Sequence, residues 1–367
     1  MKRSLLLSAL LVAALAITVQ LSAQDNPDHR ATVITFDAPG AGTNGATGQG
    51  TIGTVVNPSG AIAGFTRDAN DVRHGFLRSR DGSFTIFDAP GASTSPFEGT
   101  RAYGLNSAGA IAGYYNDASS VSHGYVRAAD GTITTFDAPG AGTSGGQGTF
   151  PFGNANIINP AGAITGYYVD SSSVAHGFVR APGGTITGFD PAGSLSTEPF
   201  GINLVGTITG NYCDATNCHG FVRAAGGTMT TFDVPGDLNG TQPNDIDPAG
   251  VVTGNYGDAD NVYHGFLRAR DGTITTFDVQ GAGTGSFQGT FPESINPAGT
   301  ITGVYTDASD VRHGFLRAGD GAITTFDAPG AGTSSGQGTF AFGINTSGAT
   351  AGYYIDGSGV YHGFVRN

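Results

Sequence analysis

Seven of the eight His residues in this 367-residue chain occupy one recurring position. Each begins a His-Gly-Phe tripeptide (once His-Gly-Tyr), and successive copies are 43 to 53 residues apart. Imidazole is the usual acid, base or metal ligand near neutral pH. Because each copy of a repeat carries one His, the seven are kept apart and cannot share one metal ion. We therefore expect structural residues that hydrogen-bond a neighbouring turn: His74, His123, His176, His219, His264, His313 and His362.

Aspartates also recur twice in each repeat. One follows a Thr-rich segment that ends in Phe-Asp, and the other lies in a turn such as Asp68-x-x-Asp71 or Asp307-x-x-Asp310. We expect both kinds of Asp at the same rim of the fold, where their carboxylates could contribute to a calcium site. A calcium ion needs six to eight oxygen ligands. No Asp-x-Asp-x-Asp-Gly run is present, and Asp commonly forms turns. We therefore expect these Asp residues to form turns, and we assign no metal site. Calcium is the one cofactor that stays open.

Positions where the repeats differ are the candidates for ligand binding. The three Glu residues of the chain all lie in or just before the segment that begins the four-stranded repeat, which we expect to line a central channel. Two carboxylates about 5–10 Å apart at the channel could catalyse hydrolysis of a glycosidic bond or an elimination that breaks it. The candidate ligand-binding set is Glu98, Arg101, Tyr103, Asn244, Asp245 and Glu293.

Cys213 and Cys218 are the only cysteines and flank one turn, in Cys-Asp-Ala-Thr-Asn-Cys. Two such residues in an exported protein predict a disulfide. The spacing is wrong for a redox Cys-x-x-Cys pair, and no second pair completes a zinc site.

An Arg ends each His-Gly-Phe-x-Arg segment, as in His313 to Arg317. We expect these Arg to pair with turn carboxylates such as Asp81, Asp130, Asp271 or Asp320, or to cap strand ends.

Four short strands form each repeat. In residues 289–327 they are expected at 289–295, 300–306, 311–318 and 322–327, separated by turn sequences such as Asn-Pro-Ala-Gly. Short strands rich in β-branched and aromatic residues, with a turn signal every 8–12 residues, indicate an antiparallel meander. A repeat of this length with four strands is typical of a β-propeller blade.

The two ends of the repeat region complement one another. Residues 32–37 form a fourth strand with no preceding three, and residues 360–365 form a third strand with no fourth after it. The sequence therefore predicts an all-β, seven-bladed β-propeller with four antiparallel strands per blade. Its ring is closed by the N-terminal strand pairing with the C-terminal three strands. An open β-solenoid is the alternative.

The first 23 residues have a different character. Lys2 and Arg3 precede an apolar run that ends in Leu21-Ser22-Ala23, the pattern of a secretory signal peptide. We expect a signal peptide at 1–23, an N-terminal segment at 24–31 and the propeller at 32–367. The protein is then secreted, to the periplasm or the cell exterior, and not inserted in a membrane.

The amino-acid composition limits the classes of molecule that the protein can bind. The formal net charge is −13, with 16 Lys and Arg against 29 Asp and Glu. No basic patch is available to displace counterions from a phosphate backbone, which excludes nucleic acid as a partner. The 62 Gly residues are mainly turn positions, and 10% aromatic residues supply a core.

The repeats resemble the HAF-type extracellular repeat family of bacterial secreted proteins. The resemblance rests on His-Gly-Phe-x-Arg, as at His313, and on Thr-Phe-Asp-Ala-Pro-Gly-Ala, as at Thr135 to Ala141, and covers the whole mature chain. It departs most at Asp190 to Gly193 and Asn203 to Gly206. The resemblance implies export and a repeat-built β-fold, and implies no activity.

These observations favour an exported, monomeric, non-catalytic binding module for a polar ligand such as a glycan, or for a protein. The alternatives are a carbohydrate-active hydrolase or lyase with acids at the channel mouth, and a structural cell-surface protein.

Overall fold

The computed structural model describes residues 31–153 and 157–367, and these contain 28 strands and one short 3₁₀ turn, η2 (Gly45–Thr47). The predicted all-β class is confirmed. The predicted signal peptide at 1–23 lies outside the described residues, as does the segment 24–31 except for its last residue. Within the described part of the chain, no helix is long and apolar enough to cross a membrane.

The strands form four-stranded antiparallel meanders, which we number along the chain. Meander 1 contains β2 (Gly50–Val56), β3 (Ile62–Arg67), β4 (Arg73–Arg78) and β5 (Phe84–Phe87). Meander 2 contains β6 (Thr100–Leu105), β7 (Ile111–Asn116), β8 (Ser122–Arg127) and β9 (Ile133–Phe136). Meander 3 contains β10 (Gly148–Phe150), β11 (Ile164–Val169), β12 (Ala175–Arg180) and β13 (Ile186–Phe189). Meander 4 contains β14 (Ser196–Ile202), β15 (Ile208–Cys213), β16 (Cys218–Arg223) and β17 (Met229–Phe232).

The second half of the chain continues the pattern. Meander 5 contains β18 (Thr241–Ile246), β19 (Val252–Gly257), β20 (Tyr263–Arg268) and β21 (Ile274–Phe277). Meander 6 contains β22 (Gly289–Ile295), β23 (Ile301–Thr306), β24 (Arg312–Arg317) and β25 (Ile323–Phe326). Meander 7 contains β26 (Gly338–Ile344), β27 (Thr350–Ile355) and β28 (Tyr361–Arg366), and its fourth strand is β1 (Val33–Phe36) from the other end of the repeat region.

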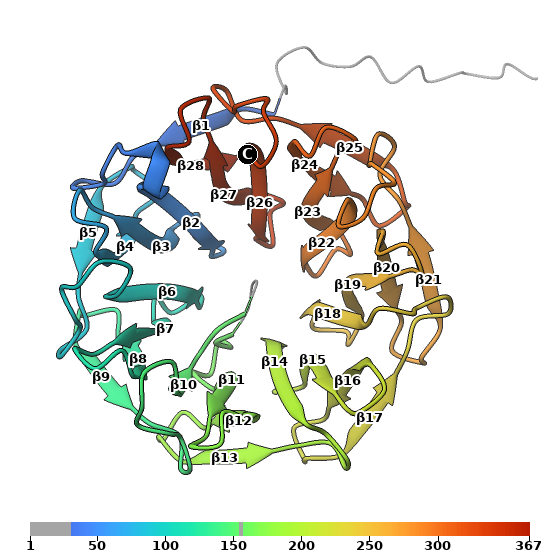
Figure 1. The fold of residues 1–367 in the computed structure, drawn as a ribbon, viewed down its shortest axis with the longest axis horizontal. Coiled ribbons are helices and arrows are strands. Elements are labelled where there is room, and N and C mark those ends of the chain that lie inside the picture. The colour runs from blue at the N-terminus through green and yellow to red at the C-terminus, as the bar shows by residue number, and fades with distance from the viewer. Residues whose placement is uncertain (1–30, 154–156) are drawn as a thin grey trace, which may run out of the picture. The chain divides into compact units, whose positions relative to one another are not determined.

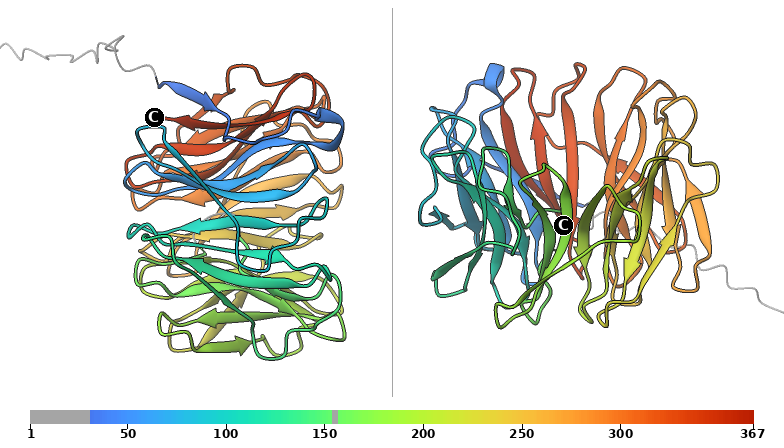
Figure 2. Two further views of the ribbon diagram at one scale, coloured as in Figure 1. Left: turned by 90° about the vertical axis from the view of Figure 1, so that its left-hand side faces the viewer. Right: turned by 60° about the horizontal axis from the view of Figure 1, so that its bottom comes forward.

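Residues 32–367 form one compact unit in which the meanders follow one another around a central axis (Figure 1). The first strand lies nearest the axis and the fourth lies outermost in meanders 1, 2 and 4 to 7, so β2, β6, β14, β18, β22 and β26 surround the centre. The side views in Figure 2 show the sheets packed face against face.

The repeated sequence motif explains the core. The Phe of His-Gly-Phe is fully buried, as at Phe315, and packs beside Ile301 of the neighbouring strand. The Gly before it is required by close packing, because a Cβ on Gly314 would lie 2.6 Å from the ring of Phe326. The Thr near the start of the inner strand is also fully buried, and Thr290 Oγ1 accepts a hydrogen bond from the backbone N–H of Val279 at 3.0 Å. One motif therefore builds the same local packing in each meander.

Of the two expectations for the motif Arg residues, pairing with a turn carboxylate is not observed, whereas contacts at strand ends are: Arg317 Nη1, for example, donates to the carbonyl of Ala318, just after β24, at 3.4 Å. Among the described residues, no ion pair within 4.0 Å joins them to a turn carboxylate. Each guanidinium instead lies over the ring of a Phe in the outer strand of the preceding meander, with Cζ 4.6–5.1 Å from the ring centroid. A cation over an aromatic face gains attraction without a carboxylate. The pairs are Arg78 with Phe36, Arg127 with Phe87, Arg180 with Phe136, Arg223 with Phe189, Arg268 with Phe232, Arg317 with Phe277, and Arg366 with Phe326.

Candidate functional site

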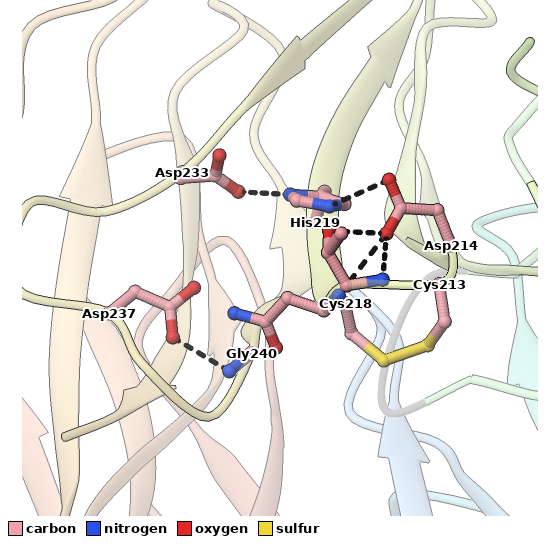
Figure 3. Close-up of a disulfide and its surroundings, with 9 residues drawn as sticks. Cys213, Asp214, Cys218, His219, Asp233, Asp237 and Gly240 are labelled. Carbon is pink, nitrogen blue, oxygen red and sulfur yellow. Dashed lines mark hydrogen bonds and ion pairs between the residues drawn. A yellow bond between two sulfur atoms is a disulfide. The ribbon is translucent and has the colours of Figure 1, made fainter. Parts of the chain in front are cut away.

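Each motif His lies between two Asp residues of its own meander. Nδ1 is 2.7–3.0 Å from the Asp that follows the fourth strand, and Nε2 is 3.4–3.7 Å from the Asp of the turn before the third strand. In Figure 3, His219 stands between Asp233 and Asp214 in this way. An ionised carboxylate can only accept, so Nδ1 carries a proton. The His therefore joins the outer strand to a turn.

Two carboxylates around one imidazole favour its charged form. The hydrogen bond to Asp88 raises the pKa of His74 above its ordinary value of 6.5. Burial opposes protonation of His219, but its bond to Asp233 and the nearby acids still raise its pKa. The turn Asp is shifted the other way, because the N–H of Val174 hydrogen-bonds Asp170 and lowers the pKa of that carboxyl.

The calcium hypothesis depended on these same carboxylates. In the turn of meander 6, Asp307 Oδ1 accepts from the N–H groups of Ser309 and Val311, while Oδ2 faces His313. The described ranges contain no group of three or more His, Cys, Asp or Glu residues arranged to hold a metal ion. The acids at this rim are thus engaged in turns and His bridges.

The inner strands carry a feature that the sequence does not reveal, a β-bulge at one shared position. The pairing register shifts around a single residue in six inner strands, and a bulge re-aims the side chain of the extra residue. The residues at this position are Thr54, Tyr103, Phe200, Asn244, Glu293 and Phe342. Three of them, Tyr103, Asn244 and Glu293, are predicted site residues.

A cavity of about 210 Å³ lies at this level of the inner strands. Its walls come from meanders 1, 2, 3 and 7 and are mostly aromatic. Tyr103 packs edge-on against Phe152 at 4.8 Å and lies 6.0 Å from Phe65. Burial keeps the pKa of Tyr103 well above 10.0, so its hydroxyl stays protonated. The lining residues are Ile52, Thr54, Phe65, Tyr103, Phe152, Gly153, Phe342 and Tyr353.

Meanders 4 and 5 place polar side chains at positions that are apolar in meanders 1 and 6. Glu198 stands opposite Asn211, and Gln242 stands opposite Asn255, where meander 1 has Ile52 opposite Phe65. Burial raises the pKa of Glu198. In meander 6 the equivalent pair is Phe291 with Val304, so the polar pairs are confined to meanders 4 and 5, and Asn244 and Glu293 add polar groups at the bulge positions of meanders 5 and 6.

Asn244 and Glu293 occupy the bulge positions of meanders 5 and 6. Asn244 is 1% exposed, and its Nδ2 donates to the carbonyl of Pro292 at 2.8 Å and to Asn255 Oδ1 at 3.2 Å. Glu293 is 9% exposed, and its charge contributes to raising the pKa of Tyr353, whose main cause is burial.

The other two predicted acids have different surroundings. Asp245 is fully buried and links meanders 5 and 6, since its Oδ2 accepts from Ser294 Oγ at 2.8 Å and from the N–H of Ile295 at 3.0 Å. Glu98 lies in the loop before β6 and accepts a hydrogen bond from the Ser120 hydroxyl. Neither acid lines the aromatic cavity, and neither does Glu293. Among the described residues, the aromatic cavity therefore holds no pair of carboxylates.

Arg101 is buried beside this site rather than within it. Its Nη1 donates to Asn116 Oδ1 at 2.6 Å, its Nη2 donates to the carbonyl of Phe97 at 2.8 Å, and its guanidinium lies 4.9 Å above the ring of Tyr114.

Cys213 and Cys218 form the predicted disulfide, which closes the turn between β15 and β16 (Figure 3). The turn lies directly before His219, so the bond fixes the same turn that this His contacts.

At the turns between first and second strands, a ladder of amides links neighbouring meanders. Asn296 shows the pattern, since its Oδ1 accepts from its own turn while its Nδ2 donates to the Asn345 carbonyl at 3.1 Å. The same bond joins Asn345 to Asn57, 288 residues away. These turns surround a second cavity of about 180 Å³.

Sequence reasoning did not identify the second-strand aromatics, such as Phe65 and Tyr353, or the Asn ladder. The signal was present, because the residue after Gly in each second strand varies between repeats, while the Gly before it is constant and the residue after it is Tyr in six of the seven. The varying residues are Phe65, Tyr114, Tyr167, Asn211, Asn255, Val304 and Tyr353.

Comparison with known proteins supports the fold. No protein-family model matches the chain, and no curated protein matches it. Among solved structures, a streptogramin B lyase matches with a TM-score of 0.57 and 14% identity over 92% of this chain and 98% of its own. Virginiamycin B lyase from Staphylococcus aureus gives 0.57 and 13% over 92% and 100%. A puromycin hydrolase gives 0.55 and 12% over 84% of this chain and 51% of its own.

At these identities the similarity concerns the fold alone. The chain has an all-β fold of the β-propeller type, with a predominantly aromatic cavity near the axis.

Proposed function

We propose that this protein is an exported, non-catalytic binding module that takes a polar cyclic ligand, a glycan, in the cavity beside Tyr103. The observation that carries the proposal is a contrast between meanders in the residues of the inner strands. Tyr103, Phe152 and Phe342 form an aromatic wall of the cavity, whereas Asn244 and Glu293 occupy in meanders 5 and 6 the bulge positions that Tyr103 and Phe342 occupy in meanders 2 and 7.

This contrast suits a sugar ring. The apolar C–H face of a pyranose packs on aromatic rings, and its hydroxyl groups need amide or carboxylate partners to fix their orientation. Asn211 and Asn244 each have a buried side-chain oxygen that receives no hydrogen bond from the described residues. Neither residue lines the cavity, so a ligand that extends from the cavity toward meanders 4 and 5 would bring a hydroxyl donor to these oxygens. Such a donor is favourable because an unsatisfied buried acceptor is costly.

Two further features belong to the proposal. The meanders are the blades of a closed seven-bladed β-propeller, supported by the pairing of β1 with β28 and by the Asn345 to Asn57 bond. Export through the signal peptide at 1–23 is supported by the disulfide, which is typical of oxidising compartments. The HAF-type resemblance of the repeats agrees with export.

Glycan-array screening followed by calorimetry tests the proposal. The variant Tyr103→Leu keeps an apolar side chain but loses the planar face, so binding should weaken at least about ten-fold. The control is Tyr305→Leu, which removes a Tyr that stacks on His313 at 4.9 Å and does not line the cavity. A blank array, or equal binding by Tyr103→Leu and wild type, would overturn the assignment. Cleaved glycan after incubation would overturn the non-catalytic role.

A further inference from the structure

Two like charges stand directly opposite one another in meander 1. Arg67 on β3 and Arg73 on β4 are a cross-strand pair. Like charges in this position destabilise a sheet. The equivalent pairs in the other meanders contain at most one cation: Asn116 with Ser122, Val169 with Ala175, Cys213 with Cys218, Gly257 with Tyr263, Thr306 with Arg312, and Ile355 with Tyr361.

Arg101 adds a third cation from meander 2. Arg73 bridges to Gly99, two residues before Arg101, through a parallel β-bridge. Phe97 connects the group, since the Arg67 guanidinium lies 4.8 Å above its ring and its carbonyl accepts from Arg101.

In the part of the chain that the structure describes, no carboxylate forms an ion pair within 4.0 Å with any Arg of this cluster. Arg67 donates to the carbonyls of Thr47 and Gly48, and Arg101 donates to neutral oxygens. Arg73 Nη1 is buried and has no acceptor among the described residues.

The excess of positive charge affects the ionisation of Arg73. Burial, followed by the charges of Arg101 and Arg67, lowers the pKa of Arg73 to about 10. Three cations held together without a counterion, in a chain of net charge −13, cost stability in the unliganded protein.

The cluster adjoins the aromatic cavity. The Arg101 guanidinium stacks on Tyr114, and the ring of Tyr114 stacks on that of Tyr103 with centroids 5.7 Å apart. Tyr103 lines the cavity, and so does Phe65, which lies two residues before Arg67 on the same face of β3.

We propose that Arg67, Arg73 and Arg101 form an anion site for an acidic group on the bound glycan, the carboxylate of a uronic acid or a sulfate ester. This inference rests on the proposed function for its ligand class, and the cluster itself can be tested separately. Guanidinium groups recognise both oxyanions through charge-assisted hydrogen bonds.

The first experiment uses an inorganic anion alone. Sodium sulfate should raise the Tm of the wild-type protein above its value in sodium chloride of equal ionic strength. Arg73→Gln should lose this shift and should have a higher Tm than wild type without sulfate, because it removes a repulsion. Arg270→Gln, at an exposed Arg of the turn before β21, should behave as wild type. An equal sulfate shift in Arg73→Gln, or none in wild type, overturns the anion site whatever the glycan result.

The second experiment compares matched glycans. An oligouronide against its methyl ester, and a sulfated oligosaccharide against its desulfated form, distinguish the two anions. The acidic member of one pair should bind wild type at least ten-fold more tightly, and Arg73→Gln should abolish that preference while retaining the neutral ligand. Equal binding of acidic and neutral members overturns the anion site but leaves the glycan proposal standing. Failure of every glycan, with the sulfate shift intact, overturns the proposed function instead.

Discussion

His362 on β28 and Asp37, which follows β1, lie 2.9 Å apart although 325 residues separate them in the chain. The six other motif His residues make the same contact with an Asp only 14 residues away. In meander 7 this His–Asp contact therefore joins the two ends of the repeat region, whereas in the other meanders it joins neighbouring strands of one repeat.

Removal of residues 360–367 should unfold the whole unit rather than only fray meander 7, because it deletes the strand to which β1 is paired. Phe364→Ala, which removes one fully buried ring but keeps the strand, is the control and should cost about 3–5 kcal/mol with cooperativity retained. Circular dichroism during denaturant unfolding measures both. A truncated protein with an unchanged Tm would show that this pairing does not hold the unit together.

Stability should decline as the pH rises above neutrality. The folded pKa values of His74 and His219 are raised, so their contribution is complete below about 6.5 and is lost as the pH rises through the raised values. The folded pKa values of Asp170 and Asp258 are lowered, so their contribution is present above 3.8 and is lost on acidification. The Tm should therefore be highest between about pH 4 and 6.5.

The double variant His74→Gln/His219→Gln provides the control for this pH dependence. Gln cannot titrate, so the fall in Tm between about pH 6 and 8 should become shallower than in the wild type. An unchanged slope would contradict the assignment to these two His residues.

Asp247→Asn should stabilise the protein. Asp247 occupies the position of the Asn ladder but lacks the side-chain N–H that Asn203 donates to its neighbour's carbonyl at 3.0 Å. The substitution supplies that donor toward Asn296 and should add about 0.5–1.5 kcal/mol to the free energy of unfolding. The reverse change, Asn296→Asp, should lower it by a similar amount, and denaturant unfolding compares the two. If Asp247→Asn were less stable than the wild type, the missing donor at this position would not be what limits the stability that the ladder contributes.

Reduction of the Cys213–Cys218 disulfide should have a modest effect. The bond closes a loop of very few residues, so its loss should lower the free energy of unfolding by about 2 kcal/mol. Thiol titration before and after unfolding establishes the redox state, and Cys213→Ser/Cys218→Ser should respond to no reductant. Two reactive thiols in the native protein would contradict the bond.

Repetition is what made much of this fold predictable. Strand positions, turn sequences and the buried Phe of each His-Gly-Phe motif recur with every copy, so local propensity and periodicity agree. The disulfide was predictable because Cys213 and Cys218 flank one turn. The Arg partners were not, because Arg317 contacts Phe277 of another meander and no sequence spacing encodes that contact.

The sequence by itself determined the all-β class, the four-stranded repeat and the residues that vary between copies, because these depend on local backbone preference and side-chain periodicity. Only the tertiary structure decided what those residues do together. The bulge that re-aims Tyr103, the burial of Asp245 between two meanders and the approach of Arg101 to Arg67 and Arg73 all depend on how separate repeats pack. Packing between repeats places side chains that are distant in sequence, and it is there that the acidic chain concentrates positive charge beside an aromatic cavity.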